Sequence, residues 1–295
     1  MSDHILLLGD DTVLVEYGPM RMFIDGSLHG VRQPKLCVQA AEKAIGFLEE
    51  IAAHRLSVQA PFHMLAEPPQ QLLTHVMWEA VSSVADDDLT PMAAVAGTIA
   101  DAVADFLEAE GLTKIAVNNG GDVAVRVKHG EALVVGIRPD VQKNSLSHRI
   151  VVTHDMQIGG ICTSGLGGRS LTRGIASAAT VFAARASVAD AAATAVANAT
   201  YVPSAAVHRA SAESIDPNTD LRCVDITVDV DELTPGEIER GLTGGIRRAE
   251  NLVERGLIKG ACVAVKGRMA CTQAIAPTID TNLRSKKEEL GRNFL

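Results

Sequence analysis

The spacing of apolar side chains divides the chain into helical stripes and short strand-like runs. In residues 36–54 apolar positions recur every three or four residues, as in an amphipathic helix. The residues on this stripe are Val38, Ala41, Ile45, Leu48, Ile51 and Ala52. Thr90-Pro91 is typical of a helix start and predicts a helix over 92–110. Gly97 lies inside that helix at a cost of roughly 1 kcal/mol relative to Ala, so we expect it to pack closely against another backbone.

Shorter apolar runs bounded by Gly, Pro, Asn and Asp predict strands. Residues 4–25 indicate short strands with turns at 9–11 and 17–19. Further strands are predicted at 114–118, 123–127, 132–137, 148–154, 157–162, 177–183, 224–230 and 260–265, and further helices at 71–84, 187–199 and 235–256. Residues 55–70 and 203–221 are predicted as loops. This order is typical of the α/β class (α+β mixed), with mixed sheets flanked by helices. We expect one domain of two packed halves over residues 1–277 and a polar tail over 278–295.

Composition and charge narrow the range of partners. The 295 residues are 47% hydrophobic but only 3% aromatic, which predicts an aliphatic, alanine-rich core. The formal net charge is −9 and no block of Lys or Arg occurs. Nucleic acid is therefore not an expected partner, since phosphate neutralisation needs clustered cations. A small nucleotide or other anionic substrate is compatible, because backbone N–H groups and a metal ion can hold it. The oligomeric state stays open, a homo-oligomer included.

The five cysteines are odd in number, scattered and without a C-x-x-C pair: Cys37, Cys162, Cys223, Cys262 and Cys271. We therefore expect neither a disulfide framework nor a structural zinc site, and we expect a reducing compartment. The first residues carry no basic region, and no run of about 20 apolar residues occurs. These features predict a cytoplasmic protein with no membrane partner.

The segment from Asn118 to Asp122 lies between two predicted strands. Asn-Gly is a strong hairpin signal, so a plain turn is one interpretation. In the other, Gly120 and Gly121 let a ligand approach the backbone, while Asn119 and Asp122 offer polar contacts. The local sequence leaves both interpretations open.

A second segment, residues 159–174, holds six glycines, four hydroxyl side chains and two arginines. Glycines free backbone N–H groups for binding an anion, and Arg169 or Arg173 can contact a phosphate. The pattern is neither a Walker A loop nor a G-x-G-x-x-G fingerprint. A flexible surface loop is the alternative interpretation.

A third segment, residues 187–198, has polar residues Asp190, Thr194 and Asn198 at every fourth position of a helix otherwise made of Ala and Val. Such a helix is expected to be buried, and its polar groups then need partners. Carboxylate and hydroxyl oxygens suit a hard cation such as Mg²⁺. The alternative is a local cap in which Ser187 starts the helix and Asp190 stands at its third position.

Four of these features, in this order along the chain, resemble the ApbE-like superfamily: Asn118–Asp122, Val135-Gly136-Ile137-Arg138-Pro139, Thr163-Ser164-Gly165, and the helix with Asp190 and Thr194. The closer resemblance is to an uncharacterised, non-lipoprotein branch of that superfamily, and it covers most of residues 1–270. It includes Pro91–Gly97, Cys162–Ser164, Ala189–Ala195 and Ala249 with Gly256-Leu257-Ile258.

The resemblance implies an ApbE-like fold that binds FAD or FMN with Mg²⁺, in a superfamily whose transferases move FMN from FAD onto a protein hydroxyl. By position, Asp190 and Thr194 match the metal ligands. The candidate cofactor-binding residues are Asn119, Gly120, Gly121, Asp122, Thr163, Gly165 and Arg169. The transferases also carry a His-Ile-x-Asp-Pro-x-x-Gly segment. Here the corresponding interval, residues 168–175, contains no His, Asp or Pro.

Three functional hypotheses follow. The first is an Mg²⁺-dependent enzyme that transfers flavin or hydrolyses FAD. The second is a flavin-binding module without this chemistry. In the third, the scaffold acts on another small anionic substrate, with Cys162, Ser164 or Ser170 in the chemistry. A buried cysteine is more often a small apolar side chain than a nucleophile, so Cys162 has a structural interpretation as well.

Overall fold

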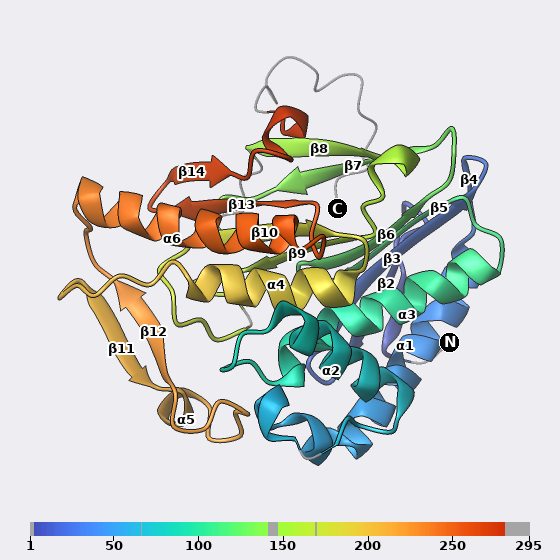
Figure 1. Ribbon diagram of the computed structural model, residues 1–295. Helices are drawn as coiled ribbons and strands as arrows, with labels where there is room; N and C mark the ends of the chain where they lie inside the picture. Colours follow the sequence, from blue (N-terminus) through green and yellow to red (C-terminus); the bar gives the residue numbers. More distant parts are fainter. Residues whose placement is uncertain (1–2, 66, 141–146, 169, 281–295) are drawn as a thin grey trace.

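A computed structural model describes residues 3–65, 67–140, 147–168 and 170–280. The largest unit is a ten-stranded antiparallel sheet in the order β1-β2-β3-β5-β6-β9-β10-β13-β14, with β4 paired to β3 (Figure 1). Its strands are β1 (Ile5–Leu7), β2 (Val13–Tyr17), β3 (Met20–Leu28), β4 (Val31–Arg32), β5 (Lys114–Asn119), β6 (Asp122–Val127), β9 (Gly160–Ser164), β10 (Ala178–Ala183), β13 (Gly260–Val265) and β14 (Arg268–Cys271).

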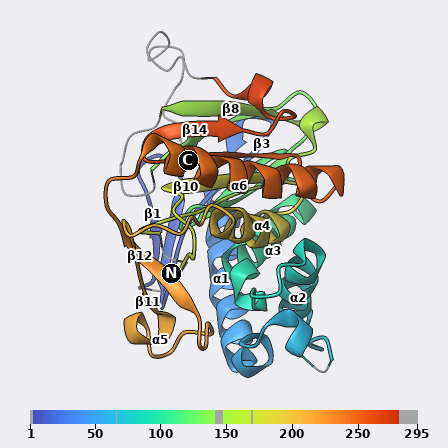
Figure 2. The ribbon, with the colours of Figure 1, turned by 60° about the vertical axis from the view of Figure 1, so that its left-hand side comes forward.

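Helices cover one face of this sheet. Those in contact with strands are α1 (Pro34–Ala53) on β2 and β3, α3 (Val95–Ala109) on β5 and β6, α4 (Ala186–Asn198) on β9 and β10, and α6 (Pro235–Glu254) on β13. Figure 2 shows α6, α4 and α3 following one another across the sheet. Helix α2 (Leu72–Val84) packs on α4. No helix within the described part of the chain is long and apolar enough to cross a membrane.

Helices α3 and α4 come into very close contact because their facing residues are small. A Cβ atom at Gly97 would lie only 2.3 Å from the carbonyl oxygen of Ala186 and 2.9 Å from the Cβ of Asp190. The expected close packing of Gly97 is therefore confirmed. Ala189, Ala192 and Ala193 of α4 are also fully buried, which is how a core poor in aromatic residues reaches native packing.

A two-stranded hairpin covers part of the opposite face of the sheet. It consists of β7 (Ala132–Ile137) and β8 (His148–Thr153), paired antiparallel. Its apolar side chains, including Val135 and Ile150, join a second buried cluster with Val125 of β6 and Phe182 of β10. The central strands are thus buried from both sides.

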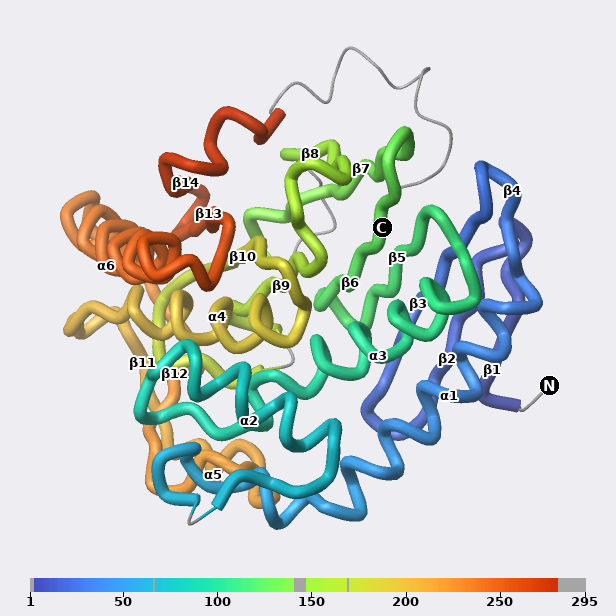
Figure 3. Tube along the Cα trace, turned by 45° about the vertical axis from the view of Figure 1, so that its right-hand side comes forward, coloured from blue at the N-terminus to red at the C-terminus, as the bar shows by residue number. Residues whose placement is uncertain are grey.

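A second hairpin lies outside the main sheet. Strands β11 (Val207–Ser211) and β12 (Asp225–Val230) pair with each other, and the short helix α5 (Ala212–Ile215) follows β11. Figures 1 and 3 place α5 beside the segment that follows α1. A hydrogen bond of 3.0 Å from Arg55 to the backbone oxygen of Asn218 joins these two regions.

The predicted class of sheets flanked by helices is confirmed, and the strand pairs of the described residues are antiparallel. The predicted helix over 92–110 begins as a 3-10 turn at Pro91–Ala94 before α3 starts at Val95. The prediction of a continuous loop over 203–221 was wrong, because this region contains β11 and α5. Strand β11 is half exposed and mostly polar, so no apolar alternation marks it. Residues 281–295 of the predicted tail lie outside the described residues.

The sequence predicts no disulfide framework, but one pair of cysteines forms a disulfide. Cys262 on β13 and Cys271 on β14 stand directly opposite each other, with their Cα atoms 4.1 Å apart, and their sulfurs are bonded. Strand register brings the two thiols together, and spacing along the sequence does not reveal register. Cys37, Cys162 and Cys223 are free.

The remaining short helical turns are the 3-10 segments Arg55–Val58, Phe62–Met64, His154–Met156 and Ala276–Thr278.

Candidate functional site

A cavity of about 1330 Å³ opens where the two glycine-rich segments and α4 meet. This exceeds the roughly 300–1,000 Å³ of a pocket that holds a drug-sized ligand, so a dinucleotide-sized molecule has room. The candidate residues from the sequence that line it are Asn119, Gly120, Gly121, Asp122, Thr163, Ser170, Arg173, Asp190, Thr194 and Asn198. Segments about 70 residues apart in the sequence are therefore brought to one cavity.

The first glycine-rich segment is a two-residue hairpin turn and a cavity wall at once. Gly120 and Gly121 join β5 to β6 with φ values of 71° and 116°, which L side chains rarely adopt. A hydrogen bond of 2.9 Å from the Gly121 N–H to the Asn118 Oδ1 closes the turn. Asn119 donates from Nδ2 to the carbonyl of Ala96 at 3.2 Å, which ties the turn to the start of α3. The two interpretations of this segment are compatible.

The second segment presents hydroxyl groups at the cavity. The Oγ of Ser170 lies 3.1 Å from the Oγ of Ser164, and the Thr163 hydroxyl lies 2.8 Å from the Thr180 hydroxyl on β10. Ser170, Thr163 and Thr180 line the cavity. Ser164 is buried behind Ser170 and does not line it. The two serines are hydrogen bonded to each other, and only Ser170 reaches the cavity.

Other members of this segment serve packing or lie outside the description. A Cβ at Gly165 would lie 2.7 Å from the backbone oxygen of Ser177, so this glycine permits a close approach of two chain segments. The backbone N–H of Arg173 donates to the Oδ1 of Asn198 at 2.9 Å, which fixes the end of the loop to α4. Arg169 lies outside the described residues.

Helix α4 carries the acidic part of the site. Asp190, Thr194 and Asn198 all line the cavity, as their spacing of four residues predicts. The local-cap interpretation was wrong, because α4 begins at Ala186 and the Asp190 carboxylate points to another helix. Its Oδ2 accepts a hydrogen bond of 2.9 Å from the backbone N–H of Gly97, in the first turn of α3.

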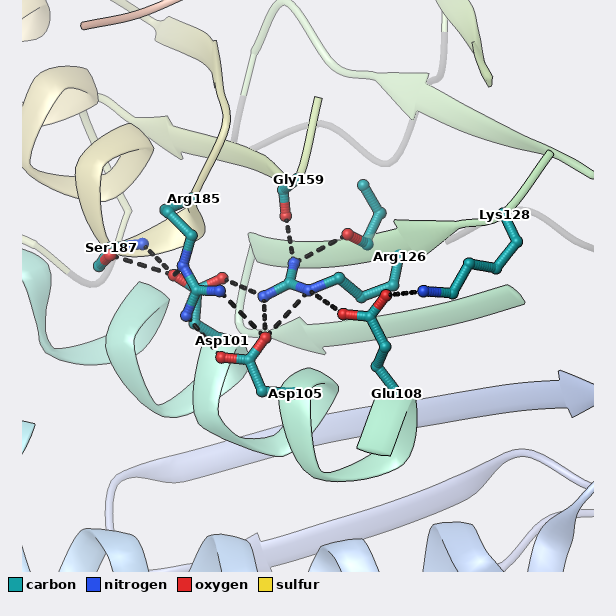
Figure 4. A network of polar contacts seen from close by, with 9 residues as sticks. Asp101, Asp105, Glu108, Arg126, Lys128, Gly159, Arg185 and Ser187 are labelled. Atoms are coloured by element: carbon teal, nitrogen blue, oxygen red, sulfur yellow. Dashed lines mark hydrogen bonds and ion pairs between the residues drawn. The ribbon is translucent and has the colours of Figure 1, made fainter. Parts of the chain in front are cut away.

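The first turn of α4 is held in return by a residue of α3. The Oδ2 of Asp101 accepts hydrogen bonds from the Ser187 N–H at 2.9 Å and the Ser187 hydroxyl at 3.0 Å (Figure 4). Asp101 is only 1% exposed and also pairs with Arg126 at 2.9 Å and Arg185 at 3.3 Å. Each of the two helices thus supplies a carboxylate to the unsatisfied N–H groups of the other, which fixes where Asp190 stands.

The carboxyl group of Asp190 has a strongly altered acidity. Desolvation raises its pKa well above the usual range, and the negative charge of Asp122 raises it further. The hydrogen bond from Gly97 opposes this shift and only partly offsets it. No basic side chain within the described residues forms an ion pair with Asp190. A buried carboxylate that forms no ion pair, with a second carboxylate close by, is a suitable environment for a cation.

The oxygen atoms at this point fit Mg²⁺ in kind. Asp190 and Asp122 offer carboxylates and Thr194 a hydroxyl, the hard oxygen donors that Mg²⁺ prefers. Mg²⁺ commonly uses one or two carboxylates and completes its shell with water and substrate phosphates. Within the described residues, no group of three or more His, Cys, Asp or Glu side chains lies close enough together to hold a metal ion. The donor set therefore suits a cation that binds together with a phosphorylated ligand.

Cys162 does not line the cavity. It is fully buried, and its thiol donates to the carbonyl of Ala186 at 3.3 Å. Burial raises the pKa of the Cys162 thiol well above its usual value, and the charges of Asp122 and Asp190 raise it further. A thiol in this state is a poor nucleophile, so the geometry gives Cys162 a packing role.

Part of the cavity wall comes from regions that sequence reasoning did not single out. Arg55 and Gln59 follow α1, and a second group of lining residues follows α5: Asp216, Asn218, Thr219, Asp220 and Leu221. The Thr90 hydroxyl is hydrogen bonded to the carboxylate of Asp220, which fixes this loop beside α3. The cluster Asp216-Pro217-Asn218 is a plain turn signal, and no sequence pattern links it to the glycine-rich segments.

The fold of this chain is similar to that of solved ApbE structures. The chain resembles the flavinyl transferase ApbE of Pseudomonas stutzeri in its apo form, with a TM-score of 0.53 over 95% of this chain and 99% of that one. Sequence identity is 14%, so the likeness concerns the fold. An ApbE-like fold is thereby shown.

Residues 5–271 match the family model described as AbpE bacteria, and the chain belongs to that family. Among similar proteins, the UPF0280 protein of Methanopyrus kandleri is 44% identical over 133 residues, which is 44% of this chain and 52% of that protein. The UPF0280 protein of Methanococcoides burtonii is 34% identical over 163 residues, 52% of this chain and 68% of that protein. The match to the first thus spans about half of that relative's length.

Proposed function

We propose that this protein binds a flavin nucleotide, FAD or FMN, together with Mg²⁺ in the cavity between the two glycine-rich segments. The carrying observation is that the Gly120-Gly121 turn, the loop with Ser170 and the face of α4 with Asp190 converge on one cavity of about 1330 Å³. Membership of the AbpE bacteria family and the ApbE-like fold support the choice of flavin.

The residues take distinct parts in this proposal. Gly120 and Gly121 leave backbone exposed to the ligand, and a Cβ at Gly121 would meet nothing within 4 Å, so the ligand can approach closely. Asp190 and Thr194, with Asp122 beside them, would hold the cation. When bound, Mg²⁺ would neutralise charge on the phosphoryl oxygens. The hydroxyls of Thr163 and Ser170 hydrogen bond the phosphates or the sugar.

The chemistry that we propose is Mg²⁺-dependent cleavage of FAD by water, which breaks one P–O bond of the pyrophosphate and releases FMN and AMP. Transfer of FMN to a protein hydroxyl is not part of the proposal. The interval of residues 168–175 holds Arg169 and Arg173 in place of a base, and arginine stays protonated.

The test begins with the purified protein, titrated with FAD in the presence of Mg²⁺ or of a chelator, with flavin fluorescence as the readout. Chromatography of the incubated mixture then measures FMN and AMP. We expect Mg²⁺ to tighten FAD binding by the wild type and to have no such effect on Asp190→Asn. Asp87→Asn, an exposed neighbour outside the cavity, is the control. If the protein binds FAD without cleaving it, the second hypothesis, a flavin-binding module, is favoured. If it binds no flavin, the proposal is wrong and the third hypothesis, another small anionic substrate, is favoured.

A further inference from the structure

A second, smaller cavity of about 270 Å³ adjoins the large one. The side chains that define it are Arg173, Arg209, Arg248, Tyr201, Asp86 and Asn198. Arg173 and Asn198 line both cavities, so the two share a wall. The three arginines come from three separate parts of the chain: the end of the second glycine-rich loop, β11 and α6. The fold, rather than a local basic run, gathers them.

Within the described residues, the guanidinium group of Arg209 keeps several hydrogen-bond donors that no other group uses. Arg209 stacks on the ring of Tyr201, 4.9 Å from its centroid, and donates to the carbonyl of Asp225. Arg248 donates to the carbonyls of Val84 at 2.9 Å and Ala85 at 3.4 Å, and to the Oδ1 of Asn251 at 3.5 Å. Neither forms an ion pair with a carboxylate anywhere in the described ranges. A guanidinium carries five N–H donors, so most donors of Arg209 remain for another acceptor.

The small cavity is positively charged within an acidic protein. Arg173 is paired with two carboxylates, Asp86 at 3.5 Å and Asp88. Arg209 and Arg248 form no ion pair with a carboxylate in the described ranges, and they line this cavity although the whole chain has a net charge of −9. A doubly charged anion can pair with both of these guanidinium groups, whereas a single carboxylate carries half of that charge.

We propose that the small cavity binds the dianionic phosphate group of a small molecule. Planar guanidinium forks match phosphate oxygens in two-point contacts, and a phosphate monoester carries a charge near −2 at neutral pH. The volume of about 270 Å³ admits inorganic phosphate or a small phosphate ester and excludes a dinucleotide. This proposal does not rest on the flavin proposal, because its ligand is different and Arg209 and Arg248 do not line the large cavity.

Arg173 lies between the small cavity and the large one. It pairs with Asp88 as well as with Asp86, and Asp88 lines the large cavity.

The experiment is calorimetric titration of the purified protein with inorganic phosphate at constant ionic strength, without flavin or Mg²⁺. We expect saturable binding in the millimolar range or tighter, and a loss of about tenfold or more in Arg209→Gln, since a charge-assisted contact is removed. Arg209 is exposed on a hairpin, so its substitution leaves the fold intact. Arg247→Gln is the matched control, because Arg247 neighbours Arg248 but does not line the cavity.

Three results overturn the proposal. One is absence of phosphate binding in the wild-type protein at about 10 mM phosphate, beyond the millimolar range expected. Another is equal binding by the wild type and Arg209→Gln, which places phosphate elsewhere, for example in the large cavity. The third is an equal loss in Arg209→Gln and Arg247→Gln, which indicates a general charge effect. Arg248→Gln adds a second arm, with circular dichroism to check its fold, because Arg248 also bonds the end of α2.

Discussion

The Oδ2 of Asp190 accepts a hydrogen bond of 2.9 Å from the backbone N–H of Gly97, across the contact between α4 and α3. The same carboxylate lines the large cavity, so one side chain joins helix packing to the candidate ligand site. In the opposite direction, the carboxylate of Asp101 on α3 accepts a hydrogen bond from the Ser187 N–H of α4. These two hydrogen bonds fix α3 and α4 relative to each other and thereby position Asp190 at the cavity.

Gly97→Ala is expected to destabilise the protein. Its new Cβ would lie 2.3 Å from the backbone oxygen of Ala186, and backbone cannot move aside cheaply. Overpacking of this kind costs about 1–3 kcal/mol. Gly46→Ala on α1 is the control, since a Cβ there meets nothing within 4 Å and alanine favours a helix by roughly 1 kcal/mol. Urea denaturation of both variants measures the difference, and equal stability of the two would contradict the close contact.

Asp190→Asn is expected to abolish the effect of Mg²⁺ on FAD binding while costing at most about 1 kcal/mol of stability, because asparagine caps a helix as well as aspartate does. Asp190→Ala removes both the cap and the proposed cation ligand, and its stability should fall further. The measurements are FAD fluorescence titrations with and without Mg²⁺ and thermal denaturation. If the role of Asp190 is only to cap α3, Asp190→Asn will respond to Mg²⁺ like the wild type.

Covalent transfer of FMN is expected to be slow even when FAD binds. A positioned base typically accelerates proton removal from an acceptor hydroxyl by about 10²–10⁴, and Arg173 cannot supply one. The protein is incubated with FAD, Mg²⁺ and a substrate carrying a flavinylation motif, and in-gel fluorescence detects bound FMN. Rapid labelling that depends on Asp190 would show that another side chain acts as the base.

The start of α6 should lose stability in acid. Hydrogen bonds from Ser204 and Thr234 lower the pKa of Glu237 from 4.5 to about 2. A depressed folded-state pKa stabilises the fold above pH 4.5, and this contribution disappears as the pH falls from 4.5 to 2. The stability difference between wild type and Glu237→Gln should therefore be largest at neutral pH and vanish near pH 2. A pH-independent difference in denaturation midpoints would contradict this assignment.

Thiol titration should distinguish the cysteines. The protein unfolded without reductant is expected to expose three reactive thiols, those of Cys37, Cys162 and Cys223, and five after reduction. Loss of the Cys262–Cys271 bond should cost about 2–3 kcal/mol, as for a closed loop of this short length. Cys271→Ser tests the cost and Cys223→Ser is its control. Five reactive thiols before reduction would contradict the disulfide.

Periodicity alone determined most helices and strands of this protein. The stripe over 36–54 became α1, and the alanine-rich segment over 187–199 became α4. Both have a repeating apolar face, which local sequence encodes directly. The sequence also predicted that Asp190 and Thr194 lie on the same side of the helix, because residues four positions apart share one helix face.

Only the tertiary structure decided what these side chains meet. Asp190 caps α3 rather than its own helix, Cys262 meets Cys271 through strand register, and three arginines from distant segments surround the small cavity. Strand β11 formed from a polar stretch because β12, beyond α5 and the loop after it, supplies its hydrogen-bond partners. The sequence by itself thus determined the periodic elements and the faces of their side chains, since these depend on neighbours within a few residues. Contacts between distant segments depend on register and packing, which no local pattern records.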